Sequence, residues 1–192
     1  MDSSPHLDII ICQGHTLRRS NPETPLEETL QALVDVVRAG KALYVGISRW
    51  PLAALQTAIS YLRERDVPLL IYQGRINMID RAPIEEGITE LCEREGVGFI
   101  SFSPLAQGLL TDRYLNGVPE DSRMSRGKFL KQDVLTPELL ARLRELNAEA
   151  QQQGKTLAER ALSWVLEQKA VTSVLVGASS TAQLERNLKC VR

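Results

Sequence analysis

The stretch GFISFSPLAQGLL, residues 98–110, begins as a short apolar run and continues as a polar turn that contains a proline. The apolar part predicts a buried strand from Val97 to Phe102. The turn places an aromatic ring, hydroxyl groups and backbone amides just beyond the strand's C-terminal end. In parallel sheets flanked by helices, ligands bind at this end. The stretch therefore predicts a strand followed by part of a ligand site.

The same pattern recurs along the chain. Four more apolar runs of strand length predict strands at 7–12, 42–47, 69–73 and 172–176. Helical spacing of apolar residues, with N-cap and stop signals, predicts helices at 25–38, from about Pro51 to Leu62, and at 83–95, 136–153, 156–168 and 181–191. Continuous apolar runs alternating with helices predict an α/β fold with a parallel sheet covered on both faces.

Two architectures fit this alternation, a doubly wound sheet and a (β/α)8 TIM barrel. No GxGxxG opens a helix, so the dinucleotide fingerprint of the doubly wound fold is missing. Five strands are too few for a complete barrel of about 250 residues. The segment 106–135, rich in Gly, Pro, Asp, Ser and Arg, departs most from the alternation and predicts a functional loop after its strand.

Length, charge and cysteine content narrow the function classes. The 192 residues fit one domain, 1–192, or part of a larger one, with 43% hydrophobic and 24% charged residues. A net charge of −1 without a basic run argues against nucleic acid and membrane partners. Three widely spaced cysteines without a CxxC pair predict neither a disulfide framework nor a metal site. With no leader-like N-terminus and no long apolar segment, we expect a cytoplasmic protein.

Several segments together resemble the aldo-keto reductases, and the branch they resemble most holds the glyceraldehyde-3-phosphate reductases and the potassium-channel β-subunits. The segments that carry the resemblance are 24–29 (TPLEET), 40–50 (GKALYVGISRW), 102–110 (FSPLAQGLL), 121–123 (DSR) and 173–179 (SVLVGAS). The resemblance implies a (β/α)8 barrel that binds NADP(H) across its C-terminal face. The five strands look like strands four to eight of that barrel, so the chain would cover roughly its C-terminal two-thirds.

The resemblance implies roles at the nicotinamide end of the cofactor. Ser48 and Arg49 match residues that hold the carboxamide, and Gln73 matches its other amide partner. Phe102 matches the aromatic residue whose face stacks on the nicotinamide ring, which fixes the face open for hydride transfer.

Further positions match the rest of the cofactor. The loop that passes the pyrophosphate is matched by Ser103, Pro104, Leu105, Ala106 and Gln107. Arg113 and Arg123 match basic residues near the pyrophosphate and the 2′-phosphate, where a guanidinium binds oxygens in bidentate fashion. The adenosine end is matched by Gly177, Ser179, Gln183 and Asn187.

The chain also departs from the family pattern. Arg186 stands where the family has a glutamate, which affects one adenosine contact. The catalytic tyrosine, lysine and aspartate of the family lie on early strands that this chain does not contain. His15 is the candidate for the catalytic histidine, although its spacing from Asp8 is longer than the family pattern; the alternative is a surface loop histidine.

Without the resemblance, the same residues have ordinary structural interpretations. Phe102 would be a core aromatic residue, and Arg113 and Arg123 would be solvated loop charges. Gln183 and Asn187 would belong to an exposed helix face. The sequence also predicts that Trp50 and Trp164 are packing residues and that Cys92 is a buried, inert thiol.

Two functions remain open from the sequence. The first is an NADP(H)-dependent oxidoreductase that reduces aldehydes or ketones to alcohols. Because general acid assistance is commonly worth about a hundredfold to ten-thousandfold, the isolated chain should reduce small carbonyl substrates feebly or not at all. The second is a non-catalytic, truncated product that pairs through open barrel edges with another copy or with a full-length relative.

Overall fold

The computed structural model describes residues 7–13, 25–118 and 134–191, with backbone only for 7–13 and Val191. By their contacts, the residues group into two compact units that are described separately. Of the described residues, those within Met1–Arg75, Ala82–Ile100 and Lys169–Ser173 form the first unit, and those within Ile76–Arg81, Ser101–Gln168 and Val174–Arg192 form the second. The expectation of a single domain over 1–192 stays a prediction.

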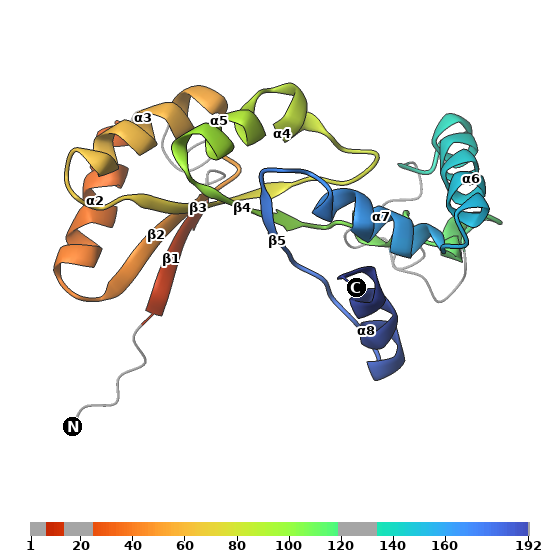
Figure 1. Ribbon diagram of the computed structural model, residues 1–192. Coiled ribbons are helices and arrows are strands. Elements are labelled where there is room, and N and C mark those ends of the chain that lie inside the picture. The colour runs from red at the N-terminus through yellow and green to blue at the C-terminus, as the bar shows by residue number, and fades with distance from the viewer. Residues whose placement is uncertain (1–6, 14–24, 119–133, 192) are drawn as a thin grey trace. The chain divides into compact units, whose positions relative to one another are not determined.

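Helices follow strands in turn along the chain (Figure 1). The strands are β1 (Leu7–Gln13), β2 (Ala42–Ser48), β3 (Leu69–Arg75), β4 (Gly98–Phe102) and β5 (Val171–Val174). The helices are α2 (Leu26–Arg38), α3 (Leu52–Arg63), α4 (Ala82–Glu85), α5 (Ile88–Glu95), α6 (Pro137–Gln152), α7 (Leu157–Leu166) and α8 (Thr181–Leu188). Short 3-10 turns occupy Ala106–Gly108, Asp112–Tyr114 and Lys189–Val191.

The strands form one five-stranded sheet in the order β1-β2-β3-β4-β5. β1 pairs with β2 in parallel, and β2 pairs with β3 in parallel. Parallel neighbours need a crossover connection, which α2 and α3 provide between these strands. The predicted α/β fold with a parallel sheet is confirmed, and the register sets Ser48 opposite Gln73 at the C-terminal ends of β2 and β3.

In the first unit, α2, α3 and α5 lie side by side along one side of the strands (Figure 1). Each helix buries one apolar stripe, as its spacing predicts. The core residues of this unit include Leu30, Leu33 and Val34 of α2, Val45 and Ile47 of β2, Leu55, Ala58, Ile59 and Leu62 of α3, and Ile88, Leu91 and Cys92 of α5.

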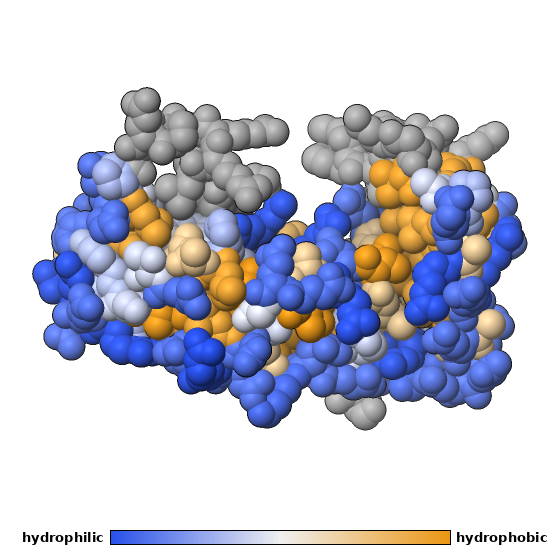
Figure 2. Space-filling view, turned by 90° about the horizontal axis from the view of Figure 1, so that it is seen from above, coloured by the Kyte–Doolittle hydropathy of each residue, from blue (hydrophilic) through white to orange (hydrophobic). Residues whose placement is uncertain are grey.

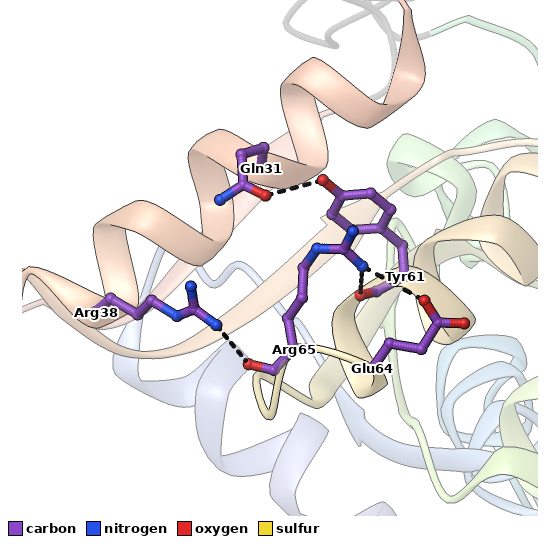
Figure 3. Close-up of polar contacts among 5 residues, drawn as sticks. All are labelled: Gln31, Arg38, Tyr61, Glu64 and Arg65. Carbon is purple, nitrogen blue, oxygen red and sulfur yellow. Dashed lines mark hydrogen bonds and ion pairs between the residues drawn. The ribbon is translucent and has the colours of Figure 1, made fainter.

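A polar cluster joins α2 to the end of α3 (Figure 3). The Tyr61 hydroxyl donates to Gln31 Oε1 at 2.9 Å, and the Arg65 guanidinium lies 3.4 Å from the centroid of the Tyr61 ring. Arg65 also donates to the Tyr61 carbonyl at 2.9 Å, and Arg38 donates to the Arg65 carbonyl at 3.3 Å. The cluster therefore fixes the two helices against each other with a stacked cation and several hydrogen bonds.

The predicted helix over 83–95 is wrong as one element, because the chain forms α4 and α5 instead. Gly87 lies between them with a φ of 78°, a left-handed conformation that ends one helix and precedes the next. Pro25 is the N-cap of α2, with no side-chain cap bond, rather than its first helical residue. The last helix ends at Leu188 and continues only as a 3-10 turn.

The expectation that both faces of every strand are covered is also wrong in part. On β2, Leu43 is 63% exposed and Tyr44 46%, and on β3 Leu70 is 37% exposed. The helices of the first unit lie along one side of the strands, so they cannot cover every apolar position. Apolar strand residues consequently remain in contact with solvent.

The second unit has its own apolar core, which includes the start of the long loop after β4. Its buried members are Leu109, Leu110, Tyr114, Leu115, Leu143, Leu146, Leu157 and Ala161. α6 begins after Thr136, whose hydroxyl accepts from the Leu139 amide at 3.2 Å. Thr156 and Glu159 form a reciprocal capping box at the start of α7.

No helix in the part of the chain that the structure describes is long and apolar enough to cross a membrane.

Candidate functional site

Strand pairing in the first unit brings together the residues expected at the nicotinamide end. Ser48, the last residue of β2, is buried and lies opposite Gln73 of β3. The amide of Arg49 donates to the Gln73 carbonyl at 3.1 Å. Arg49 has a φ of 62°, a left-handed conformation that costs a non-glycine residue energy. The register therefore sets a hydroxyl, a guanidinium and a side-chain amide at adjacent strand ends.

Trp50 and Tyr72 brace this strand end from the core side. The Tyr72 hydroxyl donates to the Trp50 carbonyl at 2.8 Å, and both side chains are almost fully buried. Burial raises the pKa of the Tyr72 phenol far above its usual value, so the group stays protonated and keeps donating. Trp50 Nε1 has no acceptor among the described residues. The prediction of Trp50 as a packing residue is confirmed.

The turn after β4, in the second unit, concentrates unusual backbone. Ser103, Ala106, Gln107 and Gly108 have φ values of 53°, 47°, 59° and 103°. Such left-handed residues cluster at functional sites, because the surrounding structure must offset their strain. Within the described residues, the amides of Ser103 and Leu105 donate to no protein acceptor. Half-buried Phe102 directly precedes the turn, so an aromatic ring is followed along the chain by unpaired amides.

Sequence reasoning missed two buried residues, of which one bonds this turn and the other bonds the end of β4 to the segment next to Asn77. Asn77, fully buried, donates from Nδ2 to the Ser103 carbonyl at 3.1 Å. Ser101, also fully buried, donates from Oγ to the Ile76 carbonyl at 3.0 Å. The available signal was a polar side chain within an apolar context, Ser101 inside a strand and Asn77 between Ile76 and Met78.

The residues expected at the adenosine end lie on α8 and just before it. The amide and the hydroxyl of Ser179 both donate to Gln183 Oε1, at 2.7 and 2.9 Å. Ser180 caps the helix by accepting from the Gln183 amide at 3.2 Å. Asn187 is only 8% exposed, and its Nδ2 has no acceptor among the described residues. Gly177 is exposed, and a Cβ there would meet no atom within 4 Å.

Arg113 is an exposed residue of the 3-10 turn Asp112–Tyr114, where its amide donates to Thr111 Oγ1 at 3.3 Å. Arg123 and His15 lie outside the described residues. Among the residues that are described, no cluster of three or more His, Cys, Asp or Glu side chains could hold a metal ion. Cys92 is buried as predicted, and burial raises the pKa of its thiol to about 12.

The chain is an α/β protein with a parallel sheet and polar residues at the C-terminal ends of its strands. Comparison with known families identifies the family. The pattern of the Aldo/keto reductase family matches residues 11–192. The chain belongs to this family.

Individual relatives place the chain within the family. It is 48% identical over 177 residues to the L-glyceraldehyde 3-phosphate reductase of Escherichia coli O157:H7, and 47% identical over 177 residues to that of strain K12. Each match covers 90% of this chain and 51% of the relative, so the chain spans about half the length of these curated relatives. A thermostable aldo-keto reductase, solved with the inhibitor epalrestat, matches with a TM-score of 0.67 and 27% identity. That match covers 98% of this chain and 55% of the other.

Proposed function

We propose that this chain is the cofactor-binding part of an NADP(H)-dependent aldo-keto reductase, with strands that correspond to strands four to eight of the family barrel. The observation that carries the proposal is the register of β2 and β3, which sets Ser48 and Arg49 beside Gln73. A hydroxyl and a side-chain amide supply the donor and acceptor atoms that a nicotinamide carboxamide needs. Phe102 offers the ring that stacks on the nicotinamide and selects its reactive face.

The remaining positions suit the phosphates and the adenosine. In the turn 103–107, unpaired amides suit pyrophosphate oxygens, because successive backbone N–H groups in turns bind anions. Arg113 and Arg123 would bind the pyrophosphate and the 2′-phosphate through their guanidinium groups. Arg123 is the reason for proposing NADP(H) rather than NAD(H).

The adenosine end provides a test of fit. An unpaired buried amide costs about 1–3 kcal/mol, so Asn187 Nδ2 calls for an acceptor that a nucleoside can supply. Gln183, one turn before Asn187 on α8, forms a hydrogen-bonded pair with Ser179, and the open space at Gly177 allows close approach of a ligand to the backbone. Arg186, exposed on α8, replaces one expected contact of the adenosine.

The reaction that we propose is the reduction of an aldehyde or ketone. Small aldehydes are the proposed class of substrate. When bound, the nicotinamide supplies the hydride. The chain itself lacks the tyrosine, lysine and aspartate that the resemblance assigns to proton transfer, and His15 is its one candidate for that machinery. Because the general acid is missing, we expect the chain alone to bind NADPH but to reduce carbonyl compounds feebly.

Titration with NADPH, followed by quenching of protein fluorescence, tests the cofactor proposal directly. We expect saturable binding of NADPH and weaker binding in Ser48→Ala and Gln73→Ala. Cys190→Ser, a change outside the proposed site, is the control. Absence of saturable binding would refute the proposed function. A separate assay of NADPH oxidation with small aldehydes tests the activity, and turnover in the usual enzyme range of about 1–1,000 per second would refute the expected inactivity.

A second candidate function is association with a partner that completes the sheet. Exposed Leu43, Tyr44 and Leu70 favour it, since apolar strand residues are usually covered. Figure 2 shows apolar residues interrupting a largely hydrophilic surface. Light scattering across a range of protein concentrations tests this alternative. A dimer, or a complex with a full-length relative, would support it, whereas a monomer at every concentration would argue against it.

A further inference from the structure

Asn77 is a fully buried side chain that makes more hydrogen bonds than its position in a loop would suggest. Its Oδ1 accepts from the amides of Ile79 and Asp80, at 3.1 and 2.8 Å. Its backbone amide donates to the Asp80 carbonyl at 3.0 Å. Both bonds to Oδ1 come from backbone donors, so the orientation of the side-chain amide follows from the bonding pattern.

With Oδ1 engaged, Nδ2 points to the Ser103 carbonyl at 3.1 Å. The same carbonyl accepts the amide of Ala106 at 2.9 Å. Two donors therefore fix the carbonyl of a residue whose φ is 53°, in the left-handed region. A strained residue persists only where its surroundings over-determine its conformation. Asn77, which lies 26 residues away in sequence, is one of the groups that restrain Ser103 in this conformation.

The orientation of Ser103 controls the amides that follow it. A peptide carbonyl and the next amide share one rigid plane, so fixing the Ser103 carbonyl also fixes the direction of the Pro104 ring nitrogen and the start of the turn. The unpaired Leu105 amide follows directly. Losing the Asn77 bond would leave the Ala106 amide as the remaining donor to the Ser103 carbonyl and loosen this plane, without altering any residue that faces the proposed cofactor.

We propose that Asn77 is a positioning residue for the cofactor, one that holds the turn 103–107 in the conformation that presents its amides to the pyrophosphate. The inference rests on the proposed function, in which that turn binds the pyrophosphate of NADP(H). Asn77 acts through the Ser103 carbonyl and touches no ligand itself. Its effect is therefore confined to ligands that carry the pyrophosphate.

Asn77→Asp is the sharpest test, because it keeps the shape of the side chain and the acceptor for Ile79 and Asp80. The donor to Ser103 is replaced by an oxygen, which repels the carbonyl. We expect NADPH to bind about tenfold more weakly, the scale of one lost hydrogen bond whose part-buried acceptor then faces an oxygen. Binding of adenosine 2′-phosphate, which has no pyrophosphate, should change by less than about twofold. Asn147→Asp on α6 makes the same chemical change as a control, and both ligands should bind it as they bind the wild type.

If Asn77 had only a structural role, the result would differ, because a loosened fold would weaken the binding of both ligands equally. Equal losses for NADPH and adenosine 2′-phosphate, or no loss for either, would overturn the inference while wild-type binding still supports the proposed function. A wild-type chain that binds neither ligand overturns the proposed function and the inference together.

A measurement on the wild-type chain covers the case in which Asn77→Asp does not fold. The side-chain amide signals of Asn77 in a 15N-labelled sample should shift on addition of NADPH and stay in place on addition of adenosine 2′-phosphate. Signals that ignore NADPH in a chain that binds it would overturn the inference.

Discussion

The C-terminal ends of β2 and β3 are held differently from the C-terminal end of β4. Ser48 and Gln73 take their places through the backbone ladder of neighbouring parallel strands. The end of β4 and the turn after it are instead held by two buried side chains. Ser101 of β4 donates to the Ile76 carbonyl, and Asn77 donates to the Ser103 carbonyl in the turn. One region owes its geometry to sheet register, and the other owes it to hydrogen bonds between side chain and backbone.

This difference determines how each region responds to mutation. A strand end fixed by register moves only when the strand itself moves, so steric pressure on the sheet is needed to displace it. A turn held by single side chains loosens when one donor is removed, because a backbone carbonyl then loses one of its hydrogen bonds. Mutations that separate steric effects from hydrogen-bond effects therefore test whether the two regions are held in these different ways.

The largest effect is expected from Gly74→Ala, directly after Gln73 on β3. A Cβ at Gly74 would lie 2.4 Å from Cζ of the buried Phe99 ring, so the strand or the ring must shift. We expect a loss of about 1–3 kcal/mol in the free energy of unfolding, as in other overpacked cores, together with weaker NADPH binding. Urea denaturation measures the first and fluorescence titration the second.

Gly177→Ala is the matched control for that change in a stability measurement, because a Cβ there meets no atom within 4 Å. We expect its free energy of unfolding to stay within about 0.5 kcal/mol of the wild type. Equal stabilities for the two variants would show that the end of β3 tolerates displacement, contrary to the argument from register.

Two buried serines at strand ends give the next largest effect. Ser101→Ala leaves the buried Ile76 carbonyl without its side-chain donor, and we expect a loss of about 1–2 kcal/mol in the free energy of unfolding. Ser48→Ala should cost under about 0.5 kcal/mol, because strand pairing holds its backbone. Chemical denaturation of both variants gives the comparison. The reverse order of stabilities would mean that the two regions are not held as described.

The two regions also differ in how far the sequence could predict them. The order of strands and helices, and the positions of Ser48 and Gln73 at strand ends, follow from apolar runs and from the rule that parallel strands share an edge. The left-handed conformations of Ser103 and Gln107 do not follow, because non-glycine residues carry no local signal for a positive φ. The Ser103 conformation is supported by Asn77, which lies far away in sequence.

Two errors in the predicted fold have different physical causes. The break between α4 and α5 occurs at Gly87, where a single glycine within a helical pattern gave only a weak stop signal. The exposed Leu43 and Tyr44 lie in an apolar run that has the composition of a strand buried on both sides. The composition of a strand shows which of its residues could be buried. Their actual exposure depends on which other elements pack against the strand.

Arg49→Gly should give a smaller effect with the opposite sign for stability. Arg49 has a φ of 62°, which glycine adopts without steric cost. We expect the variant to be more stable by about 0.5 kcal/mol, the balance between relieved strain and the greater entropy of the unfolded chain. NADPH binding should nevertheless weaken, because a guanidinium is lost. Thermal unfolding and fluorescence titration would reveal this trade-off, and a variant that loses both stability and affinity would contradict the assignment of strain to Arg49.

The smallest expected effect concerns the capping box of α7 in the second unit. Its two residues, Thr156 and Glu159, are close in sequence. The Thr156 amide donates to Glu159 Oε2 at 2.8 Å, and with the Thr156 hydroxyl it lowers the pKa of that carboxyl. Because the folded pKa is lowered, the stabilisation is present above the ordinary glutamate pKa of about 4.3 and is lost as pH falls through the folded value.

Glu159→Gln should therefore be slightly less stable than the wild type at pH 7, with a difference that shrinks as the pH falls below about 4. The glutamine can still accept the Thr156 amide, so the change isolates the charge from the hydrogen bond. Urea midpoints between pH 7 and pH 3 measure the difference, with exposed Glu185→Gln on α8 as the control. Parallel curves for wild type and Glu159→Gln would show that the charge contributes nothing, and that the box, like the turn after β4, is held by hydrogen-bond geometry alone.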